Sequence, residues 1–199
     1  MKDQYRMHLF SLLIFIITFK SFSQVTDTIP KNSRKAMTIT FPEQEIYKYV
    51  NDYLPKFILT GLDGSKIDSE FLKGKPTVIN LWFTNCAPCV EEIPVLNEIK
   101  SEYSDVVNFV AITFQEPNVV KSFLKLTEFD FFHLVNSKAY LETFGFFGYP
   151  KTIILDQDLK VMKIEKGFAT YQNTKVENEI EFKRRISSHL NELLLTSRN

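Results

Sequence analysis

The sequence lacks several features that would assign it to a common functional class. Lys and Arg together number 24, as do Asp and Glu, so no excess charge favours nucleic acid as a partner. The chain contains no internal repeat, no low-complexity tract and no glycine-rich loop that could cradle a phosphate. A single globular domain is therefore expected, because 199 residues suffice for one core but hardly for two.

Metal-binding residues are also scarce. The chain has 2 cysteines and 3 histidines. A structural zinc ion takes four ligands, and beyond the N-terminal segment only His133 and His189 could join the two cysteines. His133 lies in an apolar run, where a core histidine is the simpler interpretation. Neither a metal site nor a cofactor is expected.

The N-terminus has the pattern of a secretory signal peptide. Lys2 and Arg6 precede an apolar run over 9–19, which is shorter than the roughly 20 residues that a membrane-spanning helix needs. Small residues at 21 and 23 complete a cleavage site before residue 24. We expect residues 1–23 to be removed and the protein to reach the periplasm. The alternative is an uncleaved segment that anchors the protein to the membrane.

The next residues differ in composition from the rest of the chain. Residues 24–50 are mixed and polar, and they are predicted to be a linker or extension before a domain over 51–199. Tyr47, Val50 and Tyr53 could form one face of a short helix there.

Periodicity predicts alternating strands and helices in the domain. The Asp63-Gly64 pair between two apolar runs indicates a β-hairpin. Strands are predicted over 77–83, 106–114, 131–135, 152–155 and 160–166, and helices over 86–103, 117–126, 139–144 and 177–195. This order is typical of an α/β sandwich in which helices flank a central mixed sheet.

Cys86 and Cys89 are separated by two residues, between a predicted strand and a predicted helix. In an exported protein two cysteines usually form a structural disulfide. A loop this small gains little stability from being closed, because the stabilisation grows with loop length. A reactive pair is therefore favoured.

A Cys-x-x-Cys motif in this position is the signature of a thioredoxin-like protein. The chain resembles the TlpA/ResA-like thiol–disulfide oxidoreductases over residues 55 to 195, through Asp63-Gly64, 72–75, 82–89, 92–94 and 148–150. The resemblance implies a thioredoxin-like sandwich with an N-terminal β-hairpin and an inserted strand and helix. It also implies an enzyme that acts on protein disulfides, in processes such as cytochrome c maturation or cell redox homeostasis.

The two cysteines are expected to have different roles. Cys86 would lie at a helix N-terminus, where unpaired N–H groups and the helix dipole lower a thiol pKa, so it is the predicted nucleophile. Cys89, one turn further, would resolve the mixed disulfide. Strong oxidants of this superfamily resemble one another in carrying a histidine between the two cysteines. Here Ala87 and Pro88 occupy these positions, and no histidine is present. A reductant supplied by a membrane electron donor is therefore expected.

Asn80 stands where thioredoxins carry a buried aspartate that handles the proton of the second cysteine. An amide cannot titrate, so Glu92 is the predicted replacement. It lies three residues after Cys89, on the same helical face, and matches a glutamate that tunes the thiols in the resembled family. The alternative is a solvated acid in the first helical turns.

Pro150 matches the cis-proline that lies against the motif in this superfamily. A cis bond would let the Tyr149 backbone pair with an extended substrate; the alternative is a trans turn proline. Lys151 departs from the small hydroxyl residue common after this proline. Trp82 is predicted to pack beside the site and to contact substrate. The ring-rich stretch 144–149 is either a docking surface or part of the core edge.

Two other functions remain open from the residues alone. A thiol peroxidase would need Pro-x-x-x-Thr-x-x-Cys, but Ile79 and Phe83 occupy the proline and threonine positions. A copper chaperone of this fold would resemble Cys-x-x-x-Cys, one residue longer than the spacing found.

Overall fold

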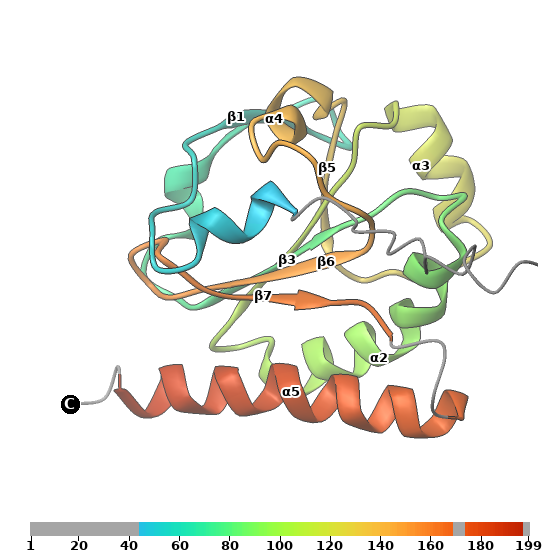
Figure 1. Cartoon of the computed structure of the whole chain (residues 1–199). Coiled ribbons are helices and arrows are strands. Elements are labelled where there is room, and N and C mark those ends of the chain that lie inside the picture. Colours follow the sequence, from blue (N-terminus) through green and yellow to red (C-terminus); the bar gives the residue numbers. More distant parts are fainter. Residues whose placement is uncertain (1–43, 169–173, 197–199) are drawn as a thin grey trace, which may run out of the picture. The chain divides into compact units, whose positions relative to one another are not determined.

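The computed structural model describes residues 44–168 and 174–196 (Figure 1). The predicted signal peptide and most of the predicted linker lie outside these residues. Within the described part, no helix is long and apolar enough to span a bilayer.

Seven strands form one sheet in the order β2-β1-β5-β4-β3-β6-β7 (Figure 1). The strands are β1 (Ile58–Gly61), β2 (Lys66–Asp68), β3 (Thr77–Leu81), β4 (Asn108–Ile112), β5 (Phe132–Val135), β6 (Lys151–Leu155) and β7 (Val161–Lys166). The central strands β3, β4 and β5 are parallel, whereas β1, β2, β6 and β7 pair antiparallel with their neighbours. The predicted mixed sheet is confirmed.

The helices are α2 (Ala87–Tyr103), α3 (Pro117–Leu124), α4 (Lys138–Glu142) and α5 (Lys175–Thr196), with short 3-10 helices η1 (Glu45–Tyr49) and η2 (Ser69–Leu72). Each strand and helix predicted from the sequence is present, with ends that move by a few residues. Gly64 has a φ of 88° in the β1–β2 turn, a conformation that glycine adopts without steric cost.

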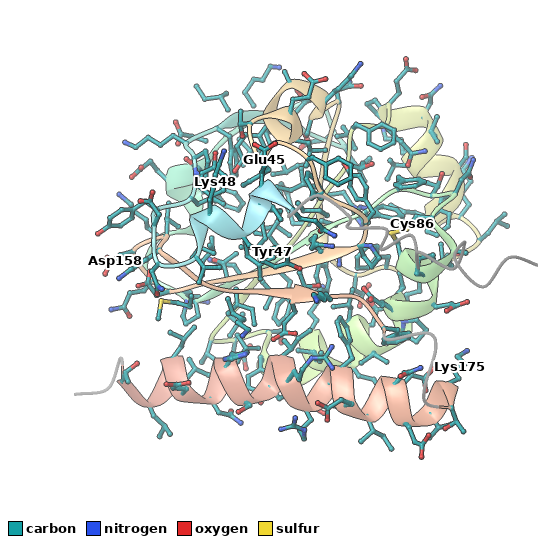
Figure 2. All side chains as sticks on the ribbon, in the orientation of Figure 1. Glu45, Tyr47, Lys48, Cys86, Asp158 and Lys175 are labelled. Atoms are coloured by element: carbon teal, nitrogen blue, oxygen red, sulfur yellow. A yellow bond between two sulfur atoms is a disulfide. The ribbon has the colours of Figure 1, made fainter. Side chains whose placement is uncertain are left out.

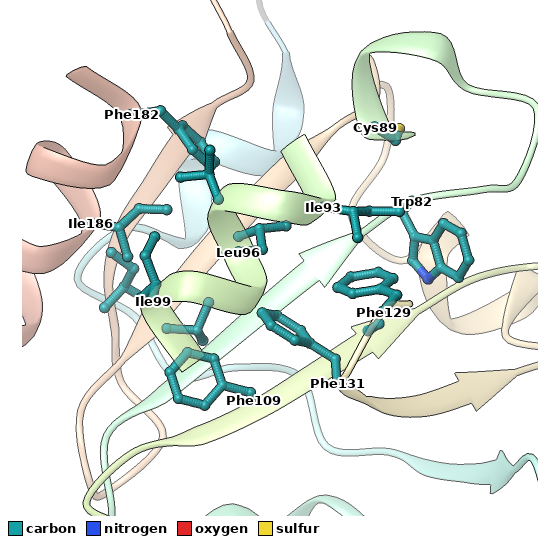
Figure 3. Close-up of a cluster of buried hydrophobic side chains, with 14 of the residues drawn as sticks. Trp82, Cys89, Ile93, Leu96, Ile99, Phe109, Phe129, Phe131, Phe182 and Ile186 are labelled. Atoms are coloured by element: carbon teal, nitrogen blue, oxygen red, sulfur yellow. The ribbon is translucent and has the colours of Figure 1, made fainter. Parts of the chain in front are cut away.

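Alternating side chains of β3 divide the interior into two cores. Val78 joins a core beneath α2 and α5, whereas Ile79 and Leu81 join a second core on the other face of the sheet. Figure 3 shows the first core, in which Phe182 and Ile186 of α5 meet α2. The ion pairs of Lys183 with Glu98 and Glu102 add contacts between these two helices.

The domain begins earlier along the chain than its polar composition indicated. Ile46 of η1 is fully buried in the second core. Of the predicted face, Tyr47 and Val50 pack against the same core, whereas Tyr53 is 63% exposed. A single isoleucine among polar neighbours produces no periodic signal.

Candidate active site

The cysteine pair sits where a buried strand gives way to a helix. β3 ends at Leu81, and α2 begins at Ala87 with Pro88 in its first turn, where a missing N–H has no cost. Cys86 is the N-cap (Figure 2), and its Sγ accepts a hydrogen bond from the Cys89 N–H at 3.3 Å. The two sulfurs form a disulfide. When the pair is reduced, the same N-terminal position stabilises a thiolate on Cys86.

The loop before Cys86 is held by a side-chain clamp that the sequence did not indicate. The Gln115 side chain accepts from the Thr84 N–H at 2.8 Å and donates to the Thr84 hydroxyl at 2.9 Å. These partners are 31 residues apart, and no local pattern links them. The clamp fixes the approach of the chain to Cys86.

Glu92 is fully buried, so its solvated alternative is wrong. Its Oε1 accepts from the Phe168 N–H at 2.9 Å, and its Oε2 has no hydrogen-bond partner. Burial raises the pKa of the Glu92 carboxyl to about 8, although the Phe168 bond and the charges of Lys151 and Arg185 act in the opposite direction. The group can therefore gain or lose a proton near neutral pH.

Gly167 allows the close packing around Glu92. A Cβ at this position would collide with Glu92 Oε1 and would lie 2.6 Å from Pro150 Cγ. Only a glycine therefore lets the chain after β7 cover both residues. No local sequence pattern predicts the role of Gly167, because an isolated glycine carries no signal of a contact 75 residues away.

Lys151 is also buried, at 5% exposure. Its ammonium donates to the carbonyl oxygens of Gly148 and, at 3.1 Å, Pro150. Burial lowers its pKa to about 8, against the attraction of Glu92. Lys151 is thus hydrogen-bonded to the main chain on both sides of Tyr149.

The Tyr149–Pro150 peptide bond is cis, as predicted. Among the described residues, neither the N–H nor the C=O of Tyr149 has a hydrogen-bond partner. The Tyr149 ring makes an edge contact with Phe83, whose centroid is 5.3 Å away. Tyr149 therefore presents an unpaired stretch of main chain close to the start of α2.

Trp82 does not occupy the position expected of a substrate-binding residue. It is fully buried, and its ring packs against Phe123, Phe129 and His133 (Figure 3). The predicted packing role is confirmed, but the substrate contact is contradicted, because this side chain points into the core beneath the loop. His133 is a core histidine that hydrogen-bonds the Phe129 carbonyl, as expected.

Asn80 is buried on β3 beside Thr152 of β6, to whose hydroxyl it donates at 3.2 Å. Its Oδ1 has no hydrogen-bond partner. The amide therefore has a structural contact, and Glu92 is the buried carboxyl one helical turn after Cys89. No group of three or more His, Cys, Asp or Glu side chains suited to a metal occurs in 44–168 and 174–196.

Two hollows flank Tyr149. The charged pocket, of about 1090 Å³, extends from Ala87 and Pro88 over β6 and β7 to α5. The aromatic pocket, of about 460 Å³, is lined by Phe114, Lys138, Leu141, Glu142, Gly145, Phe146, Phe147 and Tyr149. Tyr149 lines both pockets, so a segment lying on its main chain would border both.

A Cys-x-x-Cys disulfide at a helix N-terminus, above a mixed sheet and beside a cis-proline, defines a thioredoxin-like thiol–disulfide oxidoreductase. The chain belongs to the Redoxin family, whose model matches residues 49–180.

Curated relatives and a solved structure agree with this assignment. The chain is 33% identical to the thiol-disulfide oxidoreductase ResA of Bacillus thuringiensis over 119 residues, 58% of this chain and 69% of ResA. It is 29% identical to the thioredoxin-like protein YneN of Bacillus subtilis, over 66% of this chain and 79% of YneN. The thioredoxin domain of a thiol-disulfide oxidoreductase from Bacteroides vulgatus matches its fold with a TM-score of 0.55, at 19% identity, over 66% of this chain and 95% of that domain.

Proposed function

We propose that this chain reduces disulfides of proteins outside the cytoplasm. The observation that carries the proposal is the Cys86–Cys89 pair at the start of α2, beside the unpaired main chain of Tyr149. An extended substrate strand that hydrogen-bonds this main chain would bring its disulfide to Cys86, in the manner of strand addition. No resident metal or cofactor is needed for the exchange.

The reaction proceeds in two exchanges. The Cys86 thiolate attacks one sulfur of the substrate disulfide, which forms a mixed disulfide and expels the other substrate sulfur as a thiolate. Cys89 then attacks Sγ of Cys86, which releases the second substrate thiol and forms the disulfide seen in the structure. Two electrons pass from the protein to the substrate, and the protein must be reduced again before the next cycle.

In this proposal Glu92 handles the proton of Cys89. It follows Cys89 by one helical turn, and burial holds its pKa near 8, close to the pKa of about 8.5 of an ordinary thiol. A carboxylate and a thiol with similar pKa values exchange a proton with little driving force in either direction. Cys89 can therefore become a thiolate without releasing its proton to water.

The sequence supports the proposed direction of electron flow and the proposed location. Ala87 and Pro88 add no charge or histidine that would stabilise a thiolate strongly, which favours a reductant. The signal-peptide pattern over 1–23 favours the periplasm, where a membrane electron donor would reduce the pair. Substrates among envelope proteins or maturing cytochromes c agree with the family resemblance.

Insulin-disulfide reduction with dithiothreitol as electron source tests this function. We expect activity from the wild type, loss to the uncatalysed rate in Cys86→Ser, and a trapped mixed disulfide in Cys89→Ser. Activity that survives Cys86→Ser would overturn the proposal. Rapid consumption of peroxide without a disulfide substrate, or stoichiometric binding of Cu(I), would instead favour a thiol peroxidase or a copper chaperone.

A further inference from the structure

The charged pocket lies directly beside the cysteine pair. Ala87 and Pro88, the residues between the cysteines, line this pocket. Arg185 of α5 also lines it. Tyr149 and Pro150 form part of the same wall. A substrate segment that lies on the Tyr149 main chain and continues past Pro88 would therefore enter this pocket.

Basic side chains outnumber acidic ones in the lining. The charged residues of the pocket are Lys151, Lys163, Lys166 and Arg185 against Glu91 and Glu165, an excess of two positive charges. Glu165 is committed to neighbouring groups, because it forms an ion pair with Arg185 at 2.9 Å and its other carboxylate oxygen lies 3.3 Å from His189 Nε2. The remaining acid, Glu91, is exposed on α2.

The three lysines have no carboxylate partner of their own. Among residues 44–168 and 174–196, none of Lys151, Lys163 and Lys166 forms an ion pair. Lys151 is the most confined, because it is buried and two main-chain carbonyl groups hold its ammonium. An ammonium has three donors, so one remains after these two bonds. The Glu92 carboxyl attracts this ammonium but forms no ion pair with it, so an arriving anion would be the first to bond the remaining donor directly.

We propose that the charged pocket binds a carboxylate side chain of the substrate protein, close to the cysteine that Cys86 attacks. This inference rests on the proposed function and adds a substrate class to it: protein disulfides flanked by Asp or Glu. Lys151 supplies the fixed charge at the Tyr149 wall, and the two lysines of β7 supply mobile charges at the pocket opening. The arrangement selects substrates by charge and leaves the chemistry to the cysteines.

The size of the pocket favours a protein segment over a small free anion. About 1090 Å³ is slightly above the roughly 300–1,000 Å³ common for small-molecule sites, and the lining is drawn from five separate stretches of chain. An extended segment would also use the Tyr149 main chain, which a free anion would leave unpaired. Oxidised glutathione is a small disulfide that also carries carboxylates, so it tests whether a small anion binds the pocket in place of a protein segment.

Peptide disulfides provide the test. Each peptide in the series carries a single Glu at one of the four positions on either side of its reactive cysteine. A second peptide with Gln at the same position is its match. The single-turnover rate of the reduced protein is measured with both, and the Glu-to-Gln rate ratio is compared among variants. We expect a ratio above one at some position, which falls roughly two- to fivefold in Lys163→Gln and in Lys166→Gln and falls towards one in 0.5 M salt.

Lys125→Gln is the matched control, because Lys125 is an exposed lysine on the C-cap of α3, outside the pocket. Equal rates for Glu and Gln peptides at every position would overturn this inference and leave the proposed function intact. An equal fall of the ratio in the control would also overturn it, because the overall charge would then be the cause. Glutathione disulfide showing the same lysine dependence, with no Glu preference among peptides, would replace the protein segment by a small anion. Failure to reduce any peptide would overturn the proposed function itself.

Discussion

The charged and aromatic pockets share Tyr149 but differ in what controls them. Around the charged pocket, buried groups such as Glu92 and Lys151 have pKa values moved to about 8, so that side of the site responds to pH and salt. The aromatic pocket presents rings with exposed edges, among them Phe114 at 40% and Phe146 at 57% exposure. We therefore expect changes on the charged side to affect both folding stability and protonation, whereas the exposed rings of the aromatic side can change with little effect on the fold.

The largest expected effect concerns Glu92 and the pH dependence of stability. The folded protein keeps the Glu92 proton up to about pH 8, whereas the unfolded chain releases it near 4.5. Between these values the unfolded state binds fewer protons, so the free energy of unfolding must fall as the pH rises, by on the order of a few kcal/mol. We expect urea unfolding of the oxidised protein to show this fall between pH 5 and 8, and to show much less of it in Glu92→Gln.

Lys151 acts in the adjoining pH range. Its folded pKa is about 8, against 10.5 for an ordinary lysine, so above pH 8 the unfolded chain holds a proton that the folded protein has lost. The contribution of this group to the free energy of unfolding should rise with pH there, which places the minimum of stability near pH 8.

Comparing Glu92→Gln with the wild type cancels the contributions of surface carboxylates. An identical slope in the two proteins would show that Glu92 is not buried as an acid.

The next effect is steric and falls on the charged side alone. Gly167→Ala should place a methyl group against Glu92 Oε1 and Pro150 Cγ, and we expect it to lower the free energy of unfolding by about 1–3 kcal/mol. Gly148→Ala is the matched control for stability, because the nearest atom to its Cβ is Gln44 Nε2 at 3.9 Å. Equal losses in the two variants, measured by urea unfolding, would contradict the close packing around Glu92.

Local sequence patterns predicted most of the fold and the centre of the site. A continuous β-branched and apolar run identified β3, Asp63-Gly64 identified the hairpin, and the spacing of Cys86 and Cys89 before a helix identified the redox pair. The surroundings of the pair were harder to predict because they join distant parts of the chain. The bond from the Phe168 N–H to Glu92 spans 76 residues. Trp82 was assigned a substrate contact because sequence proximity to Cys86 does not show which way a side chain points.

The smallest expected effect tests the aromatic side. Phe146→Ala removes a ring that is 57% exposed, so the free energy of unfolding should change by less than about 0.5 kcal/mol. If substrate proteins rest on the aromatic pocket, losing one ring should slow the reduction of insulin by roughly two- to fivefold and leave the reduction of a small aromatic disulfide unchanged. Leu126→Ala is the control, because Leu126 is 90% exposed and lies outside both pockets. An equal loss of rate with the small disulfide would mean that Phe146 acts on the cysteines and not on docking, and the contrast between the two sides of Tyr149 would then fail.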